Sequence, residues 1–456
     1  MFLLALFLFA GQQEILREFQ EFLSIPNVAS DTANIRRNAD WLTQAFQRRG
    51  LRTRFLEHPG SPPAVFAELP SPNARRTVMF YAHYDGQPVD PGEWKTPPFA
   101  PVLQGDRLYA RGASDDKGPI IAMLAALDRL KGTPSNVNLK FFFEGEEEAS
   151  SPGLRNIIAS NKDLLQADVW FICDGPVHAS RKQQLYFGVR GVAGLDLTVY
   201  GANRELHSGH YGNWSPNPAM MLAQLLASMK DDSGRVLVDG FYDGVEPLGP
   251  LEKQALAEAP DIDDDLRREL ALTHTEGGGK KLIELINEPS LNIRGFSSAA
   301  SGKQARNVVP STATASLDVR LVKGVTPQGQ FHRLVQHVRK QGYYVTDREP
   351  DTDMRRTHAK IARMVFNGGY NSARTPMDLP ISREVVSLVE KVRGPVVKLP
   401  TMGGSVPLYV IEQELRVPWI GVPIVNHDNN QHAANENIRL QNLWDGIDLM
   451  AALMRL

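Results

Sequence analysis

Acidic and imidazole side chains follow several short apolar runs of this 456-residue sequence, each close to the point where a run ends. The runs are "TVMFYA", "LKFFF", "VWFIC" and "WIGVPIV", and the polar residues after them are His83, Asp85, Glu147, Glu148, Asp174, His427, Asp428 and His432. If the runs are neighbouring parallel strands, their carboxyl ends meet at one edge of a sheet, where open α/β proteins bind ligands. Imidazole nitrogens and carboxylate oxygens are ligands of zinc-like cations, so the pattern predicts a metal cluster at that edge.

Two acidic segments add to this set. "GASDDKGP" places Asp115 and Asp116 directly before a predicted helix, and "FFFEGEEEASS" carries three phenylalanines straight into four carboxylates. The phenylalanines predict burial, and carboxylates at the rim of a core repel each other and lose hydration unless a cation neutralises them. Adjacent residues at a helix start point about 100° apart, so Glu148 can bind a metal while Glu147 faces its bound water.

Each of these features alone has a simpler explanation. A histidine at a strand end is more often a hydrogen-bonded structural residue, and an Asp pair before a helix often caps that helix. An acidic run is usually a solvated helix start, and Asp174 alone is an ordinary loop acid. Their convergence favours the metal cluster. The single cysteine, Cys173, excludes an internal disulfide and a cysteine-based zinc site, which leaves His, Asp and Glu as ligands.

The composition is that of an ordinary globular protein, with 42% hydrophobic and 22% charged residues. A chain of this length predicts two domains. The net charge of -2 provides no basic field that would attract nucleic acid or anionic lipid, so partners of these kinds are not expected.

Short buried-strand runs alternate with helix-period stretches over the first 180 residues, which predicts a mostly parallel α/β sheet between helices. From about residue 185 the strands alternate apolar and polar residues, which indicates half-exposed antiparallel strands. We therefore predict a catalytic α/β domain over residues 12–186 and 352–456, and an inserted α+β domain over 187–351. Residues 240–295, rich in Gly, Pro and acids, are predicted to elaborate the insert.

Residues 2–10, "FLLALFLFA", form an apolar run much shorter than the ~20 residues that a membrane span needs. The run is typical of a signal-peptide core that ends near Ala10 and Gly11, although it lacks a basic start. We predict that residues 1–11 are the remnant of a signal peptide and that the protein is exported, to the periplasm or out of the cell. The alternative is a short buried helical extension of a cytoplasmic protein.

The motifs "HYDGQP", "GASDDKGP", "EGEEEASS" and "HSGHYG" together resemble those of the dinuclear zinc exopeptidases, which include carnosinase-type dipeptidases, glutamate carboxypeptidase and aminoacylases. The resemblance covers nearly the whole chain. It implies a zinc-exopeptidase-like α/β domain with an inserted ferredoxin-like lid domain, two Zn²⁺ per subunit, and a homodimer formed through the lid. Mn²⁺ and Co²⁺ are the alternatives to zinc.

The resemblance also implies which residues hold the metals. One zinc has the ligands His83 and Asp174, the other has Glu148 and His432, and Asp115 bridges the two. The peptide bond between Asp115 and Asp116 is implied to be cis. His432 is preferred to His427 because "HAANEN" is similar to the closing motif of the family, but both histidines lie in one loop and stay candidates.

Groups for catalysis and substrate binding are implied in the same way. Asp85 orients His83, Glu147 is the general base and then the acid, and His207 of "ELHSGHYG" reaches across a dimer interface into the partner's site. From the residues alone, His207 is a histidine in a turn. The implied substrate-binding groups are Arg320, Asn307, Gly404 and Ser405, the last two in the glycine loop "MGGSVP". A solvated strand arginine and a glycine turn before a helix are the alternatives.

Together these expectations predict one reaction. A hydroxide held by two zinc ions attacks the amide bond of a dipeptide or short peptide with a free C-terminal carboxylate, and Glu147 transfers the proton. The nearest alternative is an N-acyl amino acid deacylase or desuccinylase on the same scaffold. An inactive dimerisation module is the non-enzymatic alternative, and the complete set of ligands and base disfavours it. The "HSGHYG" insert disfavours an aminopeptidase with a different insert.

Overall fold

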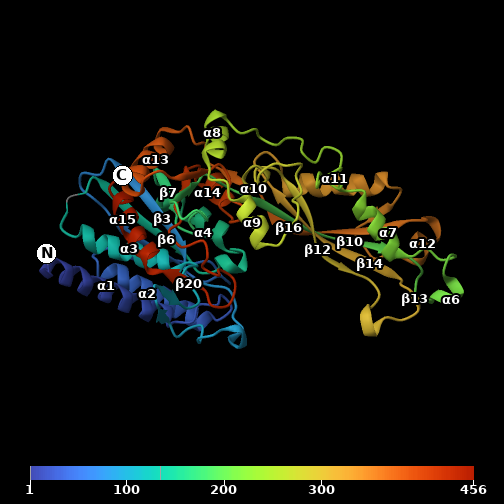
Figure 1. Cartoon of the computed structure of the whole chain (residues 1–456), viewed down its shortest axis with the longest axis horizontal. Coiled ribbons are helices and arrows are strands. Elements are labelled where there is room, and N and C mark those ends of the chain that lie inside the picture. Colours follow the sequence, from blue (N-terminus) through green and yellow to red (C-terminus); the bar gives the residue numbers. More distant parts are fainter. Residues whose placement is uncertain (1, 134) are drawn as a thin grey trace.

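The computed structural model describes residues 2–133 and 135–456, with side chains described from Gly11 onward. The molecule is elongated and has two parts (Figure 1). The first and last segments of the chain lie together in one part, which we call the α/β domain. The middle of the chain forms the other part, which we call the inserted domain.

A mixed sheet of eight strands, counted over the described residues, is the centre of the α/β domain. In sheet order the strands are β1 (Arg52–Leu56), β2 (Ala64–Leu69), β6 (Val137–Glu144), β3 (Arg76–His83), β7 (Val169–Ile172), β19 (Trp419–Gly421), β8 (Gln184–Tyr186) and β18 (Val397–Leu399). The four central strands, β6, β3, β7 and β19, are parallel. Antiparallel pairs occur toward the edges, between β1 and β2, β2 and β6, and β19 and β8. The predicted α/β class is confirmed.

The three phenylalanines of β6 are buried on both faces of this sheet. Phe141 and Phe143 pack against Phe46 on one face, with ring centroids 5.0 and 5.2 Å apart. Phe142 packs against Trp170 on the opposite face, at 5.7 Å. Because side chains alternate along a strand, a continuous apolar run fits a strand covered by helices on both sides.

Helices cover both faces of the sheet. The first face packs on α1 (Phe2–Leu23), α2 (Thr32–Gln47), α3 (Lys117–Leu130), α13 (Pro380–Arg393) and α15 (Leu440–Leu453). The second face packs on α4 (Leu154–Ser160), α5 (Lys162–Leu165) and α14 (Tyr409–Glu414). The sheet is therefore enclosed, and its strand ends are the surface on which ligands can bind.

A buried lysine connects α1 to the start of α3. Lys117 Nζ donates to the backbone oxygens of Phe22 and Ile25, both at 2.8 Å, where α1 ends. The ammonium also lies 4.4 Å from the centroid of the Phe22 ring. Burial lowers the pKa of Lys117 well below its usual range. The contact holds the first turn of α3, and the Asp pair that precedes it, against the end of α1.

The inserted domain has its own sheet, of five strands in the part of the chain that the structure describes. In sheet order these are β12 (Ser290–Ser297), β14 (Thr312–Leu321), β10 (Gly191–Tyr200), β16 (Ile361–Tyr370) and β15 (Tyr344–Thr346). Two helices, α7 (Pro218–Ala227) and α11 (Pro327–Lys340), cover one face and enclose a separate hydrophobic core. The other face of β10 and β14 is half-exposed, as the apolar-polar alternation predicts.

Two predictions about the domains need correction, namely where the chain returns to the α/β domain and which domain residues 240–295 contact. The chain does not return to the α/β domain at residue 352, because β16 pairs with β10 and β15 and extends the inserted sheet to Tyr370. A single strand carries no signal for which sheet it joins, so its sequence could not reveal this. In the elaboration over 240–295, α8 (Pro250–Glu258) packs beside β18, and its Ala255 lies in the core of the α/β domain.

The remaining short elements complete the chain. They are η1 (Pro91–Glu93), β4 (Val102–Gln104), β5 (Arg107–Tyr109), η2 (Glu147–Ala149), β9 (Gly188–Val189), β11 (Leu206–His207), α6 (Ser208–Tyr211), α9 (Asp263–Glu269), α10 (Leu282–Leu285), η3 (Gly302–Gln304), β13 (Val308–Val309), α12 (Thr352–Thr357), β17 (Ala373–Arg374) and β20 (Asn437–Arg439). Among the described residues, no helix has both the length and the apolar character needed to cross a membrane. The predicted signal remnant at 1–11 includes residue 1 and the side chains of 2–10, which lie outside the described part.

Candidate metal centre

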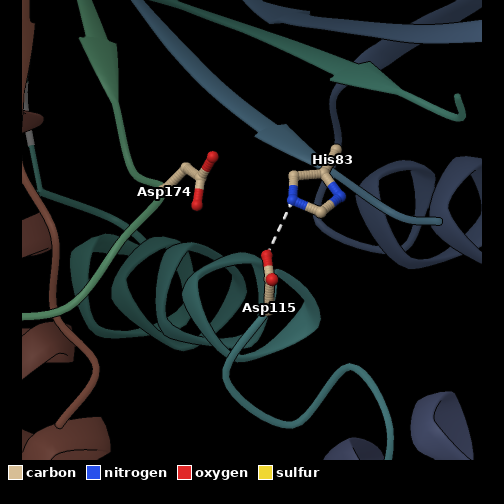
Figure 2. A group of neighbouring side chains, drawn as sticks. All are labelled: His83, Asp115 and Asp174. Atoms are coloured by element: carbon tan, nitrogen blue, oxygen red, sulfur yellow. Dashed lines mark hydrogen bonds and ion pairs between the residues drawn. The ribbon is translucent and has the colours of Figure 1, made fainter. Parts of the chain in front are cut away.

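Neighbouring strand ends bring the predicted ligands to one edge of the eight-stranded sheet. His83 is the last residue of β3, Asp174 follows β7, and Asp115 precedes α3. Figure 2 shows these three side chains pointing toward one another, with His83 Nε2 2.9 Å from Asp115 Oδ1. All three residues are buried. The rim of the sheet and the first turn of α3 therefore form one site.

The donor atoms of the predicted ligands form two groups that share one carboxylate. The groups are His83, Asp115 and Asp174, and Asp115, Glu148 and His432. In each group the donor atoms all lie within 4.8 Å of one another. The geometry therefore places Asp115 between two potential cation positions.

The second group contains His432 and not His427. His432 Nε2 lies 3.1 Å from Asp115 Oδ2 and 3.3 Å from Glu148 Oε2. His427 is exposed and belongs to neither group of described residues. The peptide bond between Asp115 and Asp116 is cis, as the resemblance implies.

Asp85 contacts both the imidazole of His83, in the first donor group, and the backbone beside Glu148, in the second donor group. His83 Nδ1 lies 3.2 Å from the backbone oxygen of Asp85 and 3.4 Å from its Oδ1. The two carboxylate oxygens accept hydrogen bonds from the backbone N–H groups of Glu147 and Glu148, at 3.1 and 3.0 Å. Asp85 therefore fixes the orientation of His83 and the start of η2 together.

Glu436 holds the loop before α3, a role that the sequence did not reveal. Its fully buried carboxylate accepts from Arg111 Nη1 at 2.7 Å, from Ser114 Oγ at 2.8 Å, and from the backbone N–H groups of Gly112, Ser114 and Asp115 at 3.0, 2.8 and 2.9 Å. The only available signal was that Glu436 is the acid of "HAANEN", four residues after His432. Its hydrogen bonds position Asp115.

The electrostatics of the cluster require positive charge. Burial, reinforced by the negative charge of Asp115, raises the pKa of Asp174 to about 6 and that of Glu148 to about 7. Burial also acts on Asp115, but hydrogen bonds from His432 and His83 hold its pKa below the usual range. Three buried carboxylates facing two imidazoles match the donor chemistry of zinc-like divalent cations. The residues present therefore fit a pair of such cations.

Glu147 lies beside the cluster but in neither donor group of the described residues. Burial raises the pKa of its carboxyl well above the usual range; the charge of His83 opposes this rise, and the charges of Asp174 and Glu148 add to it. The side chain is half-buried next to Glu148, which does belong to a donor group. Glu147 is therefore a carboxylate beside the cluster that belongs to neither donor group.

Three of the four predicted substrate-binding residues meet where the two domains join. Arg320, in β14, donates from Nη1 to Ser405 Oγ at 2.7 Å. Gly404 O accepts from the backbone N–H of Arg190 at 3.1 Å, and Ser405 O accepts from the Tyr370 hydroxyl at 3.0 Å. The glycine loop is therefore bound to the inserted sheet.

Two further predicted site residues lie in the inserted domain but away from the metal cluster. They are His207, predicted for catalysis, and Asn307, predicted for substrate binding. They are exposed and adjacent, because β11 and β13 pair and Ser208 N donates to Asn307 O at 3.0 Å. Figure 1 shows β13 and α6 at the end of the inserted domain remote from the α/β domain. Within one chain, the structure does not bring His207 or Asn307 to the predicted ligands.

Comparison with known proteins identifies the family. A model described as "Peptidase family M20/M25/M40" matches residues 79–456. The chain belongs to this family. The resemblance to zinc exopeptidases of the carnosinase type is thereby confirmed, and this M20 protein is a metallopeptidase.

Several relatives cover most of this M20 peptidase. The Beta-Ala-His dipeptidase of Homo sapiens is 30% identical over 401 residues, which span 86% of this chain and 76% of the human protein. The Cys-Gly metallodipeptidase dug1 of Schizosaccharomyces pombe is 26% identical over 464 residues, 96% of this chain and 94% of that protein. Among solved structures, the M20 family metallo-carboxypeptidase Sso-CP2 from Sulfolobus solfataricus has a TM-score of 0.83 and 29% identity, covering 97% of this chain and 99% of that chain.

Proposed function

We propose that this M20 peptidase hydrolyses dipeptides that carry a free C-terminal carboxylate, with two zinc ions held by the donor groups that share Asp115. The observation that carries the proposal is the pair of donor groups with Glu147 beside them. The printed names of two relatives, Beta-Ala-His dipeptidase and Cys-Gly metallodipeptidase, support a dipeptide substrate.

Each residue has a distinct role in the proposed reaction. When bound, the two cations would supply Lewis acidity for polarising an amide carbonyl and for making water more acidic. Glu147 accepts the proton of the attacking water on a carboxylate oxygen and returns it to the departing amide nitrogen. Asp85 keeps His83 and the backbone of Glu147 in place. Arg320 binds the terminal carboxylate of the substrate.

A substrate panel tests the proposed function. We expect dipeptides to be cleaved with a higher kcat/KM than N-acetylated amino acids, N-succinylated amino acids or folate-type glutamates. These compounds differ in the group that acylates the C-terminal residue, so the panel shows which of these groups the site accepts. A higher kcat/KM for the N-acyl amino acids would identify a deacylase or desuccinylase instead.

The position of His207 leads us to propose a homodimer. His207 and the neighbouring exposed aromatic residues Tyr211 and Trp214 lie at the remote end of the inserted domain, and Trp214 is 79% exposed. A histidine there acts on a substrate only if a second copy brings its own metal cluster close. We propose that His207 stabilises the reacting carbonyl oxygen in the partner's site.

Mixing two inactive variants tests this arrangement. Glu147→Gln and His207→Ala subunits should each be inactive alone, and dissociated and re-annealed mixtures should recover activity. Each mixed dimer contains one site with an intact Glu147 and an intact His207, so recovery approaches about a quarter of the wild-type sites under random pairing. The measurement is kcat per total subunit. Mixtures that stay at the level of the separate variants would rule out a role of His207 in trans.

A further inference from the structure

Arg190 is a buried guanidinium at the junction between β9 and β10, where the chain first enters the inserted domain. It is 8% exposed. Its Nη2 donates to Glu288 O at 2.8 Å and to Ser290 Oγ at 3.0 Å. Its Nε is buried and has no hydrogen-bond partner among the described residues. A buried N–H of a charged group without an acceptor is costly, so this guanidinium retains binding capacity that the fold leaves unused.

The same patch contains Arg320. Ser290, which accepts from Arg190, is the strand partner of Arg320 in the β12–β14 register. The backbone N–H of Arg190 donates to Gly404 O at 3.1 Å, and Arg320 Nη1 donates to the next residue, Ser405, at 2.7 Å. Strand partners share a face of the sheet, so the Arg190 guanidinium, bound to Ser290, lies on the face that carries Arg320. Both residues also contact the glycine loop, Arg190 through its backbone and Arg320 through its guanidinium.

The local charges do not balance. Arg320 Nε lies 3.2 Å from Asp318 Oδ2, and Asp318 is the acidic group whose charge also acts on Arg190. Burial, with the repulsion of Arg320, lowers the pKa of Arg190 to about 10, so its guanidinium stays protonated at neutral pH. Two cations against one carboxylate leave one excess positive charge, and one of the two cations, Arg190, is buried.

Tyr370 contacts the same glycine loop, and the charge of Glu147, the proposed proton-transfer group, acts on its hydroxyl. Tyr370, the last residue of β16, donates its hydroxyl to Ser405 O at 3.0 Å. Burial and then the negative charge of Glu147 raise the pKa of Tyr370 to about 12.

We propose that Arg190 is a second binding residue for the terminal carboxylate of the substrate and that it forms a two-guanidinium site with Arg320 and Ser405. The inference rests on the proposed function and deepens it. A carboxylate has two oxygens that accept charge-assisted hydrogen bonds, and it neutralises the excess charge. The site therefore selects substrates with an ionised C-terminus over the same substrates with a neutral one.

The test compares one dipeptide in two forms, with a free C-terminal carboxylate and as the C-terminal amide. The wild-type enzyme should prefer the acid, measured as the ratio of the two kcat/KM values. Arg190→Gln should lower kcat/KM for the acid by about 10- to 100-fold, mainly through KM, and leave the amide nearly unchanged. Arg190→Lys, which keeps a positive charge, should retain part of the preference.

Arg374→Gln is the matched control. Arg374 lies in β17, which pairs with β9 at the same domain junction, and its side chain is 10% exposed and paired with Glu246 at 2.9 Å. Replacing Arg374 should change kcat/KM for the acid and for the amide by the same factor. If Arg190→Gln lowered kcat/KM for the acid and for the amide by the same factor, Arg190 would only support the fold and the inference would be wrong. No cleavage of any dipeptide by the wild-type enzyme would instead refute the proposed function, and this inference with it.

Discussion

Glu147→Gln should leave the metal content of the protein unchanged and lower kcat by about 10²- to 10⁴-fold, the usual contribution of general acid–base catalysis. The amide has nearly the same shape as the carboxylate but cannot accept a proton at neutral pH. Metal binding should persist because Glu147 belongs to neither donor group of the described residues. The backbone N–H of residue 147, which donates to Asp85, is unaffected by the substitution. Elemental analysis and steady-state kinetics on the same preparation measure both quantities.

Glu146→Gln is the control for this substitution. Glu146 is the preceding residue and is buried, and its Oε1 accepts a hydrogen bond from the backbone N–H of Gly153 at 2.7 Å. A glutamine oxygen can accept the same bond, so we expect activity close to that of the wild type. If Glu147→Gln kept most of the wild-type kcat, the proton would have to move through another group, and the proposed mechanism would fail.

The parts of the fold that the sequence predicts are those with a local signal. The run "LKFFF" becomes part of β6, because a short, mostly apolar stretch is typical of a strand buried on both faces. The acids after such runs meet at one edge because parallel strands place their carboxyl ends together. His83 and Asp174 were predicted from these two rules, and Asp115 from its place before a predicted helix. All three lie together in the structure.

The features that the sequence does not reveal depend on contacts between distant segments. The five hydrogen bonds that Glu436 accepts come from residues 111–115, which are more than 300 positions away along the chain. A lone glutamate in a loop gives no sign of them. The pairing of β16 with β10 is equally invisible, because β16 has the composition of a strand in either sheet. Arg190 was not predicted as a site residue for the same reason. Its proposed role depends on Arg320 and Ser290, which lie on other strands.

Asp115→Ala should remove both metal ions, whereas Glu148→Ala should remove only one. The reason is that Asp115 belongs to both donor groups and Glu148 to one of them. Without Asp115, each cation keeps one carboxylate and one imidazole, too few ligands for tight binding of a zinc-like ion. In Glu148→Ala the group of His83, Asp115 and Asp174 stays complete. Elemental analysis after dialysis should give about two ions per chain for the wild type, about one for Glu148→Ala and close to none for Asp115→Ala.

Chelation of the wild-type protein provides the complementary measurement. EDTA should abolish hydrolysis, and added Zn²⁺ should restore it, because the carboxylates of Asp115, Asp174 and Glu148, all with largely buried side chains, need cations as counter-charges. Cations that bind only the folded state also stabilise it, so Tm should fall on chelation and recover with metal. Asp115→Ala should show no such change in Tm, because it has no cations to lose. An Asp115→Ala protein that retains two ions would show that the two donor groups act independently, and Asp115 could then not be the bridge on which the two-metal arrangement depends.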